Sequence, residues 1–148
     1  MQAQLIWKDS MIFTGVAEGH EVVLDAKAPI GKSSALTPKE LVVLGMGGCT
    51  AMDVIALLKK YKQKPESFVV SLDMAMSQGK LPVVFEGAQL LFEVKGQVEA
   101  DKLLQAVQLS QTKYCGVSAM LSKAFPIHYR VVLNGSEVGS GEANFETN

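Results

Sequence analysis

The sequence predicts an α+β protein in which antiparallel sheets surround one long central helix. Residues 37–62 have the composition of a single helix that is apolar on almost every face. The strand-like segments are grouped before and after this helix instead of alternating with helices, which favours antiparallel pairing. The predicted order is three strands, the long helix, two strands, two helices and two strands, in one domain over residues 1–148.

The long helix has clear start and stop signals. Thr37 is a predicted N-cap, Pro38 takes the first helical position, and Glu40 completes a capping box. Lysines gather over residues 59–64, where the helix dipole favours cations, and Pro65 is expected to end the helix. A helix that is apolar all round has to be buried on all sides. Because one chain of this size offers little cover for it, we expect a homodimer.

Before the helix, residues 3–8, 11–18 and 21–26 predict a three-stranded meander with turns at Asp9-Ser10 and Gly19-His20. After it, residues 67–77 and 83–94 predict a long hairpin around a turn at 78–80. Gly87 lies inside the second of these strands and indicates a bulge.

The last third of the chain predicts two helices and two strands. The helices cover residues 101–110 and 114–125, and Pro126 ends the second one. Residues 127–133 predict a strand, and Asn134-Gly135 is the strongest hairpin signal in the chain. A final strand is expected near residues 143–146.

Composition argues against several function classes. The net charge is −1 and the lysines near the end of the long helix form the one basic cluster, so we expect no nucleic-acid partner. Residues 41–58 approach the length of a membrane span but contain Asp53 and three glycines, so we expect this helix in a protein core and not in a membrane. The first residues lack the apolar segment of a signal peptide, which predicts a cytoplasmic protein.

Cys49 and Cys115 are the two cysteines of the chain. In a reducing compartment they are expected to be reduced or redox-active, and not a permanent disulfide. The simplest interpretation is that each is a small buried hydrophobic residue. A functional thiol pair is the other interpretation. Cys115 follows Lys113 at the start of a predicted helix, where the dipole and a cation would both lower a thiol pKa.

Three glycines, Gly45, Gly47 and Gly48, come directly before Cys49. Each glycine inside a helix costs up to ~1 kcal/mol relative to alanine. The cluster therefore indicates that another segment packs very closely here or that the helix breaks here. If the cysteines form a pair, we expect the glycines to lie against the segment around Cys115.

Asp53 lies one helical turn after Cys49, on the same face. A carboxylate there would oppose ionisation of the thiol, or it would simply make a polar contact between helices. His20 and His128 could join the cysteines in a zinc site, but none of the four residues has a close-spaced ligand in the chain. We therefore expect neither a metal nor a cofactor.

Three motifs resemble the OsmC-like proteins, a family that includes OsmC and the organic hydroperoxide resistance protein Ohr. They are the helix start Thr-Pro-x-Glu-Leu, the run Gly-x-Gly-Gly-Cys-Thr-Ala-x-Asp-Val around Cys49, and Leu-Ser-x-x-Lys-Tyr-Cys-x-Val-Ser-Ala-Met-Leu around Cys115. The Lys-Tyr-Cys-x-Val form resembles the YhfA-type branch. The resemblance covers nearly the whole chain, including the predicted strand order.

The resemblance implies an intertwined homodimer with two long helices back to back. It also implies thiol-dependent reduction of a small, hydrophobic organic hydroperoxide. Cys49 would attack the peroxide and become a sulfenic acid, and Cys115 would condense with it to a disulfide that a dithiol reductant reopens. The helix-dipole argument favours Cys115 as the more reactive thiolate, whereas the resemblance assigns the attack to Cys49.

The chain departs from the family at two activating residues. The arginine that peroxidase members contribute from the N-terminal part is missing, because the single arginine of this chain is Arg130 in a late predicted strand. The glutamate ten residues before the first cysteine is matched by Lys39. Glu40 is displaced by one residue, and on a straight helix it faces away from Cys49. Glu40 and Asp53 are therefore supporting candidates beside the catalytic candidates Cys49 and Cys115.

Two functions stay open from the sequence. One is the thiol peroxidase, with Cys49 as a slow nucleophile that reacts faster as the pH rises towards 9, since a free thiol has a pKa near ~8.5. The other is a protein that is not a peroxidase and that binds a small hydrophobic molecule or senses redox state through its thiol pair.

Overall fold

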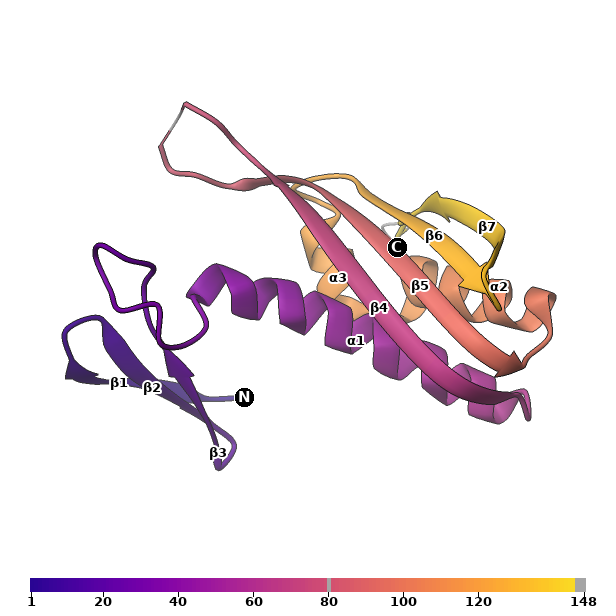
Figure 1. The fold of residues 1–148 in the computed structure, drawn as a ribbon, viewed down its shortest axis with the longest axis horizontal. Helices are drawn as coiled ribbons and strands as arrows, with labels where there is room; N and C mark the ends of the chain where they lie inside the picture. The colour runs from indigo at the N-terminus through magenta and orange to yellow at the C-terminus, as the bar shows by residue number, and fades with distance from the viewer. Residues whose placement is uncertain (80, 146–148) are drawn as a thin grey trace. The chain divides into compact units, whose positions relative to one another are not determined.

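The structure, a computed structural model, describes residues 1–79 and 81–145 (Figure 1). The chain divides into two compact units, Met1–Leu44 and Gly45–Asn148. Helix α1, Pro38–Lys60, begins in the first unit and ends in the second. The single domain predicted over residues 1–148 stays a prediction.

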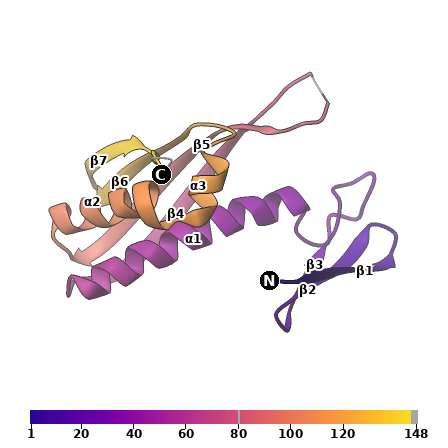
Figure 2. The same ribbon diagram turned by 180° about the vertical axis from the view of Figure 1, so that it is seen from behind.

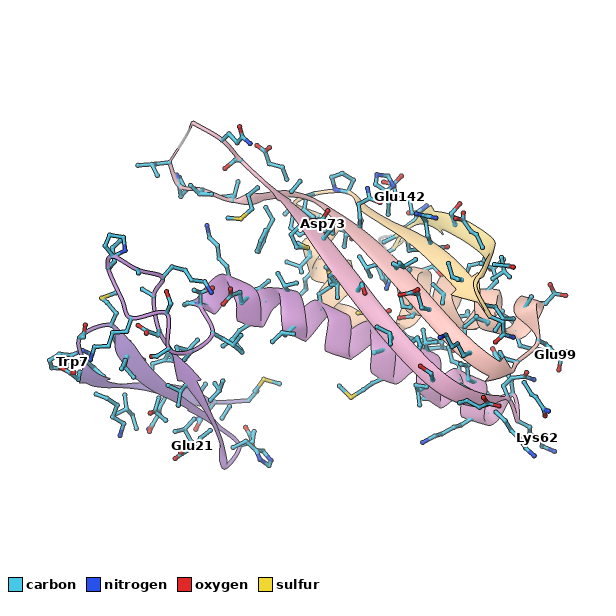
Figure 3. The ribbon with its side chains drawn as sticks, viewed as in Figure 1. Trp7, Glu21, Lys62, Asp73, Glu99 and Glu142 are labelled. Atoms are coloured by element: carbon cyan, nitrogen blue, oxygen red, sulfur yellow. The ribbon has the colours of Figure 1, made fainter. Side chains whose placement is uncertain are left out.

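The first unit contains the predicted three-stranded meander. Strands β1 (Ala3–Asp9), β2 (Ile12–Ala17) and β3 (His20–Leu24) pair antiparallel in chain order. Trp7 lies on β1 (Figure 3), and its indole Nε1 donates to the Ser10 carbonyl at 2.9 Å across the first turn. Several large apolar side chains of this small sheet are exposed within the chain, including Leu5, Trp7 and Val23.

The second unit contains a four-stranded sheet with its helices on one face (Figures 1 and 2). Strands β4 (Lys64–Met76), β5 (Phe85–Gln97), β6 (Ile127–Leu133) and β7 (Ser136–Glu142) lie in that order. With its two sheets and few helices, the chain has the predicted α+β class.

The prediction of purely antiparallel sheets is wrong at one pair, because β5 and β6 run parallel. Parallel neighbours need a long crossover connection. Residues 98–126 provide it with helix α2 (Ala100–Leu109), the π-helical turn η1 (Ser110–Tyr114) and helix α3 (Gly116–Leu121). This crossover carries Cys115, so the parallel pairing is also what brings the second cysteine to the helical face of the sheet.

The last strand was predicted in the wrong place. Strand β7 follows directly after the predicted Asn134-Gly135 turn, whereas residues 143–145 form no strand and residue 146 lies outside the described residues. The sequence of β7 is polar and rich in glycine, so it lacks a strand pattern. Its glycines leave room for core side chains: a Cβ at Gly139 would stand 2.7 Å from Leu104 Cδ1, and one at Gly141 would contact the Tyr129 hydroxyl.

Of two further predicted details, the bulge is confirmed and the helix stop is wrong. The register of the β4–β5 hairpin shifts beside Gly87, where Ala75 pairs with Gly87 and Met76 with Phe85, which confirms the bulge. The long helix ends at Lys60, and β4 begins before Pro65. Pro65 is therefore not the helix stop; it lies in an edge strand, where a missing N–H is tolerated.

The core of the second unit lies between the sheet and the helices. Helix α1 contributes Met46, Val54 and Leu58 to it, and β5 and β6 contribute most of its centre. The second unit does not cover the opposite side of α1, where Met52 is 71% exposed. Ala51, Ile55, Ala56 and Lys59 join Met52 around an open, mainly apolar hollow of ≈ 380 Å³. The expectation that α1 is buried on all sides is thus not met by one chain alone.

By length and composition, α1 is also apolar enough to cross a membrane, and no other helix of the described residues has these properties. The core helix of a water-soluble protein has the same properties, and one face of α1 packs in the core described above.

Candidate functional site

The two cysteines meet in the second unit. Their sulfur atoms and a carboxylate oxygen of Asp53 all lie within 4.8 Å of one another. Cys49 and Asp53 are half-buried on α1, and Cys115 is fully buried at the N-cap of α3. Both cysteines are free thiols. A disulfide needs a sulfur–sulfur distance of about 2.05 Å, so a small local movement would join them.

Cys115 is held as a neutral thiol. Burial raises the pKa of the Cys115 thiol to about 11, and the neighbouring Cys49 adds to the rise, although the Ser118 N–H that points to the sulfur acts in the opposite direction. Lys113 lies over the ring of Tyr114, 5.6 Å from its centre. The helix-dipole argument for Cys115 as the more reactive thiolate is therefore wrong, because burial outweighs the cap of a short helix.

A buried chain of hydrogen bonds runs beside the thiols. The Gln111 amide Nε2 donates to Thr50 Oγ1 at 2.8 Å, and Ser110 Oγ donates to Asp53 Oδ2 at 3.0 Å. Thr50 and Ser110 hydroxyls lie 2.8 Å apart. Since the single Ser110 proton goes to the carboxylate, Thr50 is the donor in that third bond. All the bonds thus point towards Asp53, which is the polar contact between helices considered for it above.

Ser110 connects the two cysteine-bearing segments. Its side chain bonds to Thr50 and Asp53, which follow Cys49 within about one turn of α1. Its carbonyl accepts the backbone N–H of Cys115 at 3.0 Å, the bond that closes the π-helical turn η1. Ser110 therefore contacts both segments and helps to hold Cys115 beside Cys49. Its signal in the sequence is weak, because residues 110–112 are visible there only as a polar interruption of an apolar pattern.

Replacing Ser110 with alanine should lower the free energy of unfolding by about 1–3 kcal/mol, because Thr50 loses an acceptor and Asp53 a donor inside the protein. The same variant should form the Cys49–Cys115 disulfide more slowly. Urea denaturation and the rate of thiol loss under a mild oxidant measure the two effects. Ser122→Ala is the matched control, since this serine only caps α3 locally through the Ala119 carbonyl. Equal results for the two variants would contradict the role of Ser110.

The glycines before Cys49 do not act as predicted. Helix α1 is continuous through them, so the helix does not break. Gly47 faces β4, where an added Cβ would stand 2.7 Å from Leu72 Cδ1. Gly45 and Gly48 have no heavy atom within 4 Å of such a Cβ. The expectation that these glycines lie against the Cys115 segment is wrong within the chain, and only Gly47 has a close-packing reason there.

Glu40, the second supporting candidate, has other partners. It completes the predicted capping box, with its Oε2 accepting from the Thr37 N–H at 2.7 Å, and its Oε1 lies 2.8 Å from Lys27 Nζ. The bond from Lys27 is the main cause that lowers the pKa of Glu40 to about 2, and the Thr37 N–H adds to it. A supporting role for Glu40 at the thiols stays a prediction.

The arginine and the two histidines considered from the sequence have the following places in the structure. Arg130 makes two bonds to Glu137 Oε2, at 2.9 and 2.7 Å. The Nδ1 atom of His128 lies 3.8 Å from Glu142 Oε2, and His20 begins strand β3 in the first unit. Among the described residues, the group that could hold a metal ion contains both cysteines and Asp53, and neither histidine.

Comparisons with known proteins agree on one family. The family model of OsmC-like proteins matches residues 31–130. The chain is 35% identical to Protein YhfA from Escherichia coli strain K12 over 136 residues, which cover 89% of this chain and 98% of YhfA.

Solved structures share the fold. A hypothetical protein from Aquifex aeolicus VF5 superposes with a TM-score of 0.79 at 25% identity, covering 99% of this chain and 97% of that one. An organic hydroperoxide resistance protein from Elizabethkingia anophelis, solved with bound thiocyanate, has a TM-score of 0.63 at 16% identity, with 90% of this chain and 94% of that one covered. The family match, which spans most of the chain, confirms the resemblance noted in the motifs. This chain is a member of the OsmC-like protein family.

Proposed function

We propose that this protein reduces organic hydroperoxides with the thiols of Cys49 and Cys115. The observation that carries the proposal is that both sulfurs lie within 4.8 Å of each other on two segments joined through Ser110. Membership of the OsmC-like family and the shared fold with an organic hydroperoxide resistance protein support it.

The exposure of the thiols supports Cys49 as the attacking residue. Cys49 is half-buried, whereas Cys115 is fully buried and burial raises its pKa to about 11. The Cys49 thiolate attacks the terminal oxygen of the hydroperoxide, the one that carries the hydrogen. The O–O bond breaks, and the alkoxide leaves and takes up a proton to become the alcohol. The Cys49 sulfenic acid then condenses with the Cys115 thiol to a disulfide and water. A dithiol reductant restores both thiols by exchange.

The test is thiol titration of the reduced protein before and after one equivalent of cumene hydroperoxide, with hydrogen peroxide in parallel. Both thiols should be lost together, and mass spectrometry should find a Cys49–Cys115 disulfide. A dithiol should then restore them over many cycles. Retention of both thiols after the organic peroxide would overturn the proposal.

A second candidate function is a redox sensor or a carrier of a small hydrophobic molecule. The observation in its favour is that Arg130 is paired with Glu137 on β6 and β7 and so does not replace the activating arginine at the thiols. A sensor would form the same disulfide once, without repeated turnover when a dithiol is supplied. The rate of sustained peroxide consumption separates the two functions.

Replacing Asp53 with asparagine should raise the rate at which the Cys49 thiol reacts at pH 7, in alkylation as in oxidation, by about two- to fivefold. A carboxylate within 4.8 Å of the sulfur opposes negative charge on it, whereas the amide oxygen still accepts the Ser110 bond. Alkylation of Cys49 by iodoacetamide in a Cys115→Ser background measures the effect. Asp73→Asn, an exposed change on β4, is the control. A slower reaction of the Asp53 variant would show that the carboxylate assists the thiol.

The proposed assembly is a homodimer. Its support is the apolar surface that one chain leaves exposed: Met52 and its neighbours on α1 in the second unit, and separately the sheet of the first unit. Exposed apolar surface of this extent is typical of an interface. The proposed partners are a second copy, a hydrophobic peroxide and a dithiol reductant, and the proposed location is the cytoplasm.

Met52→Lys should weaken self-association at least about tenfold, because it places a charge in an apolar interface. Sedimentation at a series of protein concentrations measures the dissociation constant. Gln108→Lys adds the same charge at an exposed position of α2 and should leave the constant unchanged. If both variants associate like the wild type, the α1 face is not part of an interface.

A further inference from the structure

We propose that the reduced thiol site also binds one thiophilic divalent cation, of the Zn²⁺ or Cd²⁺ type, through Cys49 Sγ, Cys115 Sγ and the Asp53 carboxylate. The three donor atoms lie within 4.8 Å of one another. Around a tetrahedral zinc ion with bonds of ~2.3 Å to sulfur, two sulfurs stand about 3.8 Å apart. A small contraction of the observed group therefore gives a coordination shell.

The Asp53 carboxylate is held in place by a hydrogen bond from Ser110. Ser110 Oγ donates to Asp53 Oδ2 at 3.0 Å, which uses one carboxylate oxygen and restrains the plane of the group. A carboxylate has about four lone-pair sites, so this one bond leaves acceptor capacity for a cation. Hydrogen bonds that orient a ligand in this way are a regular part of protein metal sites. The series of hydrogen bonds from Gln111 through Thr50 to Ser110 connects Asp53 to the buried interior and restrains it further.

The three ligands suit a soft cation by their chemistry, and solvent can reach them. Two thiolates favour Zn²⁺ or Cd²⁺ over Mg²⁺ or Ca²⁺, which prefer oxygen ligands. Cys49 and Asp53 are half-buried, so a cation reaches the site from their side, and three protein ligands leave a fourth position for water. On binding, each thiol releases its proton to solvent, and the three negative ligands leave a net charge of −1 on the complex.

The cation and the disulfide exclude each other. The disulfide contains no thiolate, so oxidation of Cys49 and Cys115 removes two of the three ligands and releases the cation. A bound cation in turn holds both sulfurs and prevents attack on a peroxide. This regulatory consequence depends on the proposed peroxidase function, but cation binding itself does not.

The test uses reduced protein and Cd²⁺ alone, followed through the ultraviolet charge-transfer absorption of cadmium–thiolate bonds. One Cd²⁺ per chain should saturate the band. The band should be absent from the disulfide form and should lose about half its intensity or more in Cys49→Ser and in Cys115→Ser. Asp53→Asn should bind Cd²⁺ at least about tenfold more weakly.

Asp73→Asn is the matched control, because Asp73 lies exposed on β4 (Figure 3) and should leave the affinity unchanged. Circular dichroism checks that each variant is folded. The inference is overturned if no band forms, if the band survives both cysteine substitutions, or if Asp53→Asn binds like Asp73→Asn. None of these readouts involves a peroxide, so failure of the proposed reaction would leave cation binding intact, and the reverse also holds.

Discussion

Cys49→Ser should lose at least about a thousandfold in the reduction of cumene hydroperoxide, because no other group in the site replaces the attacking sulfur. Cys115→Ser should behave differently. Its Cys49 should still consume one equivalent of peroxide and then stop as a sulfenic acid, which a dimedone adduct at Cys49 reveals by mass spectrometry. The two variants therefore separate attack from resolution.

Stability measurements are the control for this pair. Cys49 is half-buried, whereas Cys115 is fully buried, so the second substitution should destabilise the fold more than the first. The assignment of roles would be reversed if Cys49→Ser reacted with peroxide and Cys115→Ser did not. Repeated turnover by Cys115→Ser at the wild-type rate with a dithiol would show that the reductant resolves the sulfenic acid directly.

Phe92→Ala should lower the free energy of unfolding by about 3–5 kcal/mol, a large part of the total for a typical domain. Phe92 is 0% exposed at the centre of the second unit. Its ring stacks on Phe68 at 6.4 Å and meets Tyr129 edge-on at 6.4 Å. The alanine variant leaves a cavity between the sheet and the helices, which this close-packed cluster fills only in part.

Urea denaturation of Phe92→Ala beside Glu93→Ala measures this effect. Glu93 is the next residue of β5 and faces the exposed side, so its substitution should change the free energy of unfolding by less than about 0.5 kcal/mol. Similar losses for the two variants would show that the core is not where the structure places it. Peroxide reduction should fall in Phe92→Ala only as far as the folded fraction falls.

The strongest local signals in the sequence predicted the fold well. The capping box at Thr37 and Glu40 marks the start of α1, and Asn134-Gly135 marks the β6–β7 turn. Both depend on short-range backbone chemistry that a few residues determine. The parallel pairing of β5 with β6 was not predicted, because it depends on how a long crossover packs and not on the residues of the two strands.

The candidate site was predicted only where short-range signals in the sequence determine it. Helical spacing placed Asp53 on the face of Cys49, and the family motif paired Cys49 with Cys115. The burial of Cys115 depends on the whole core around α3, so the local argument for a reactive thiolate failed. Ser110 and Gln111 were visible only as an interruption of an apolar pattern, since their partners on α1 are far away in the chain.

The crossover between β5 and β6 has a consequence for the newly synthesised chain. Helix α1 and the β4–β5 hairpin involve neighbouring parts of the chain and are free to form early, whereas the β5–β6 pairing has to wait for residues 98–126. During translation, Cys49 therefore leaves the ribosome well before Cys115 exists. In that interval Cys49 has no resolving partner, so a nascent chain that meets oxidant is expected to be trapped as a mixed disulfide or to oxidise irreversibly.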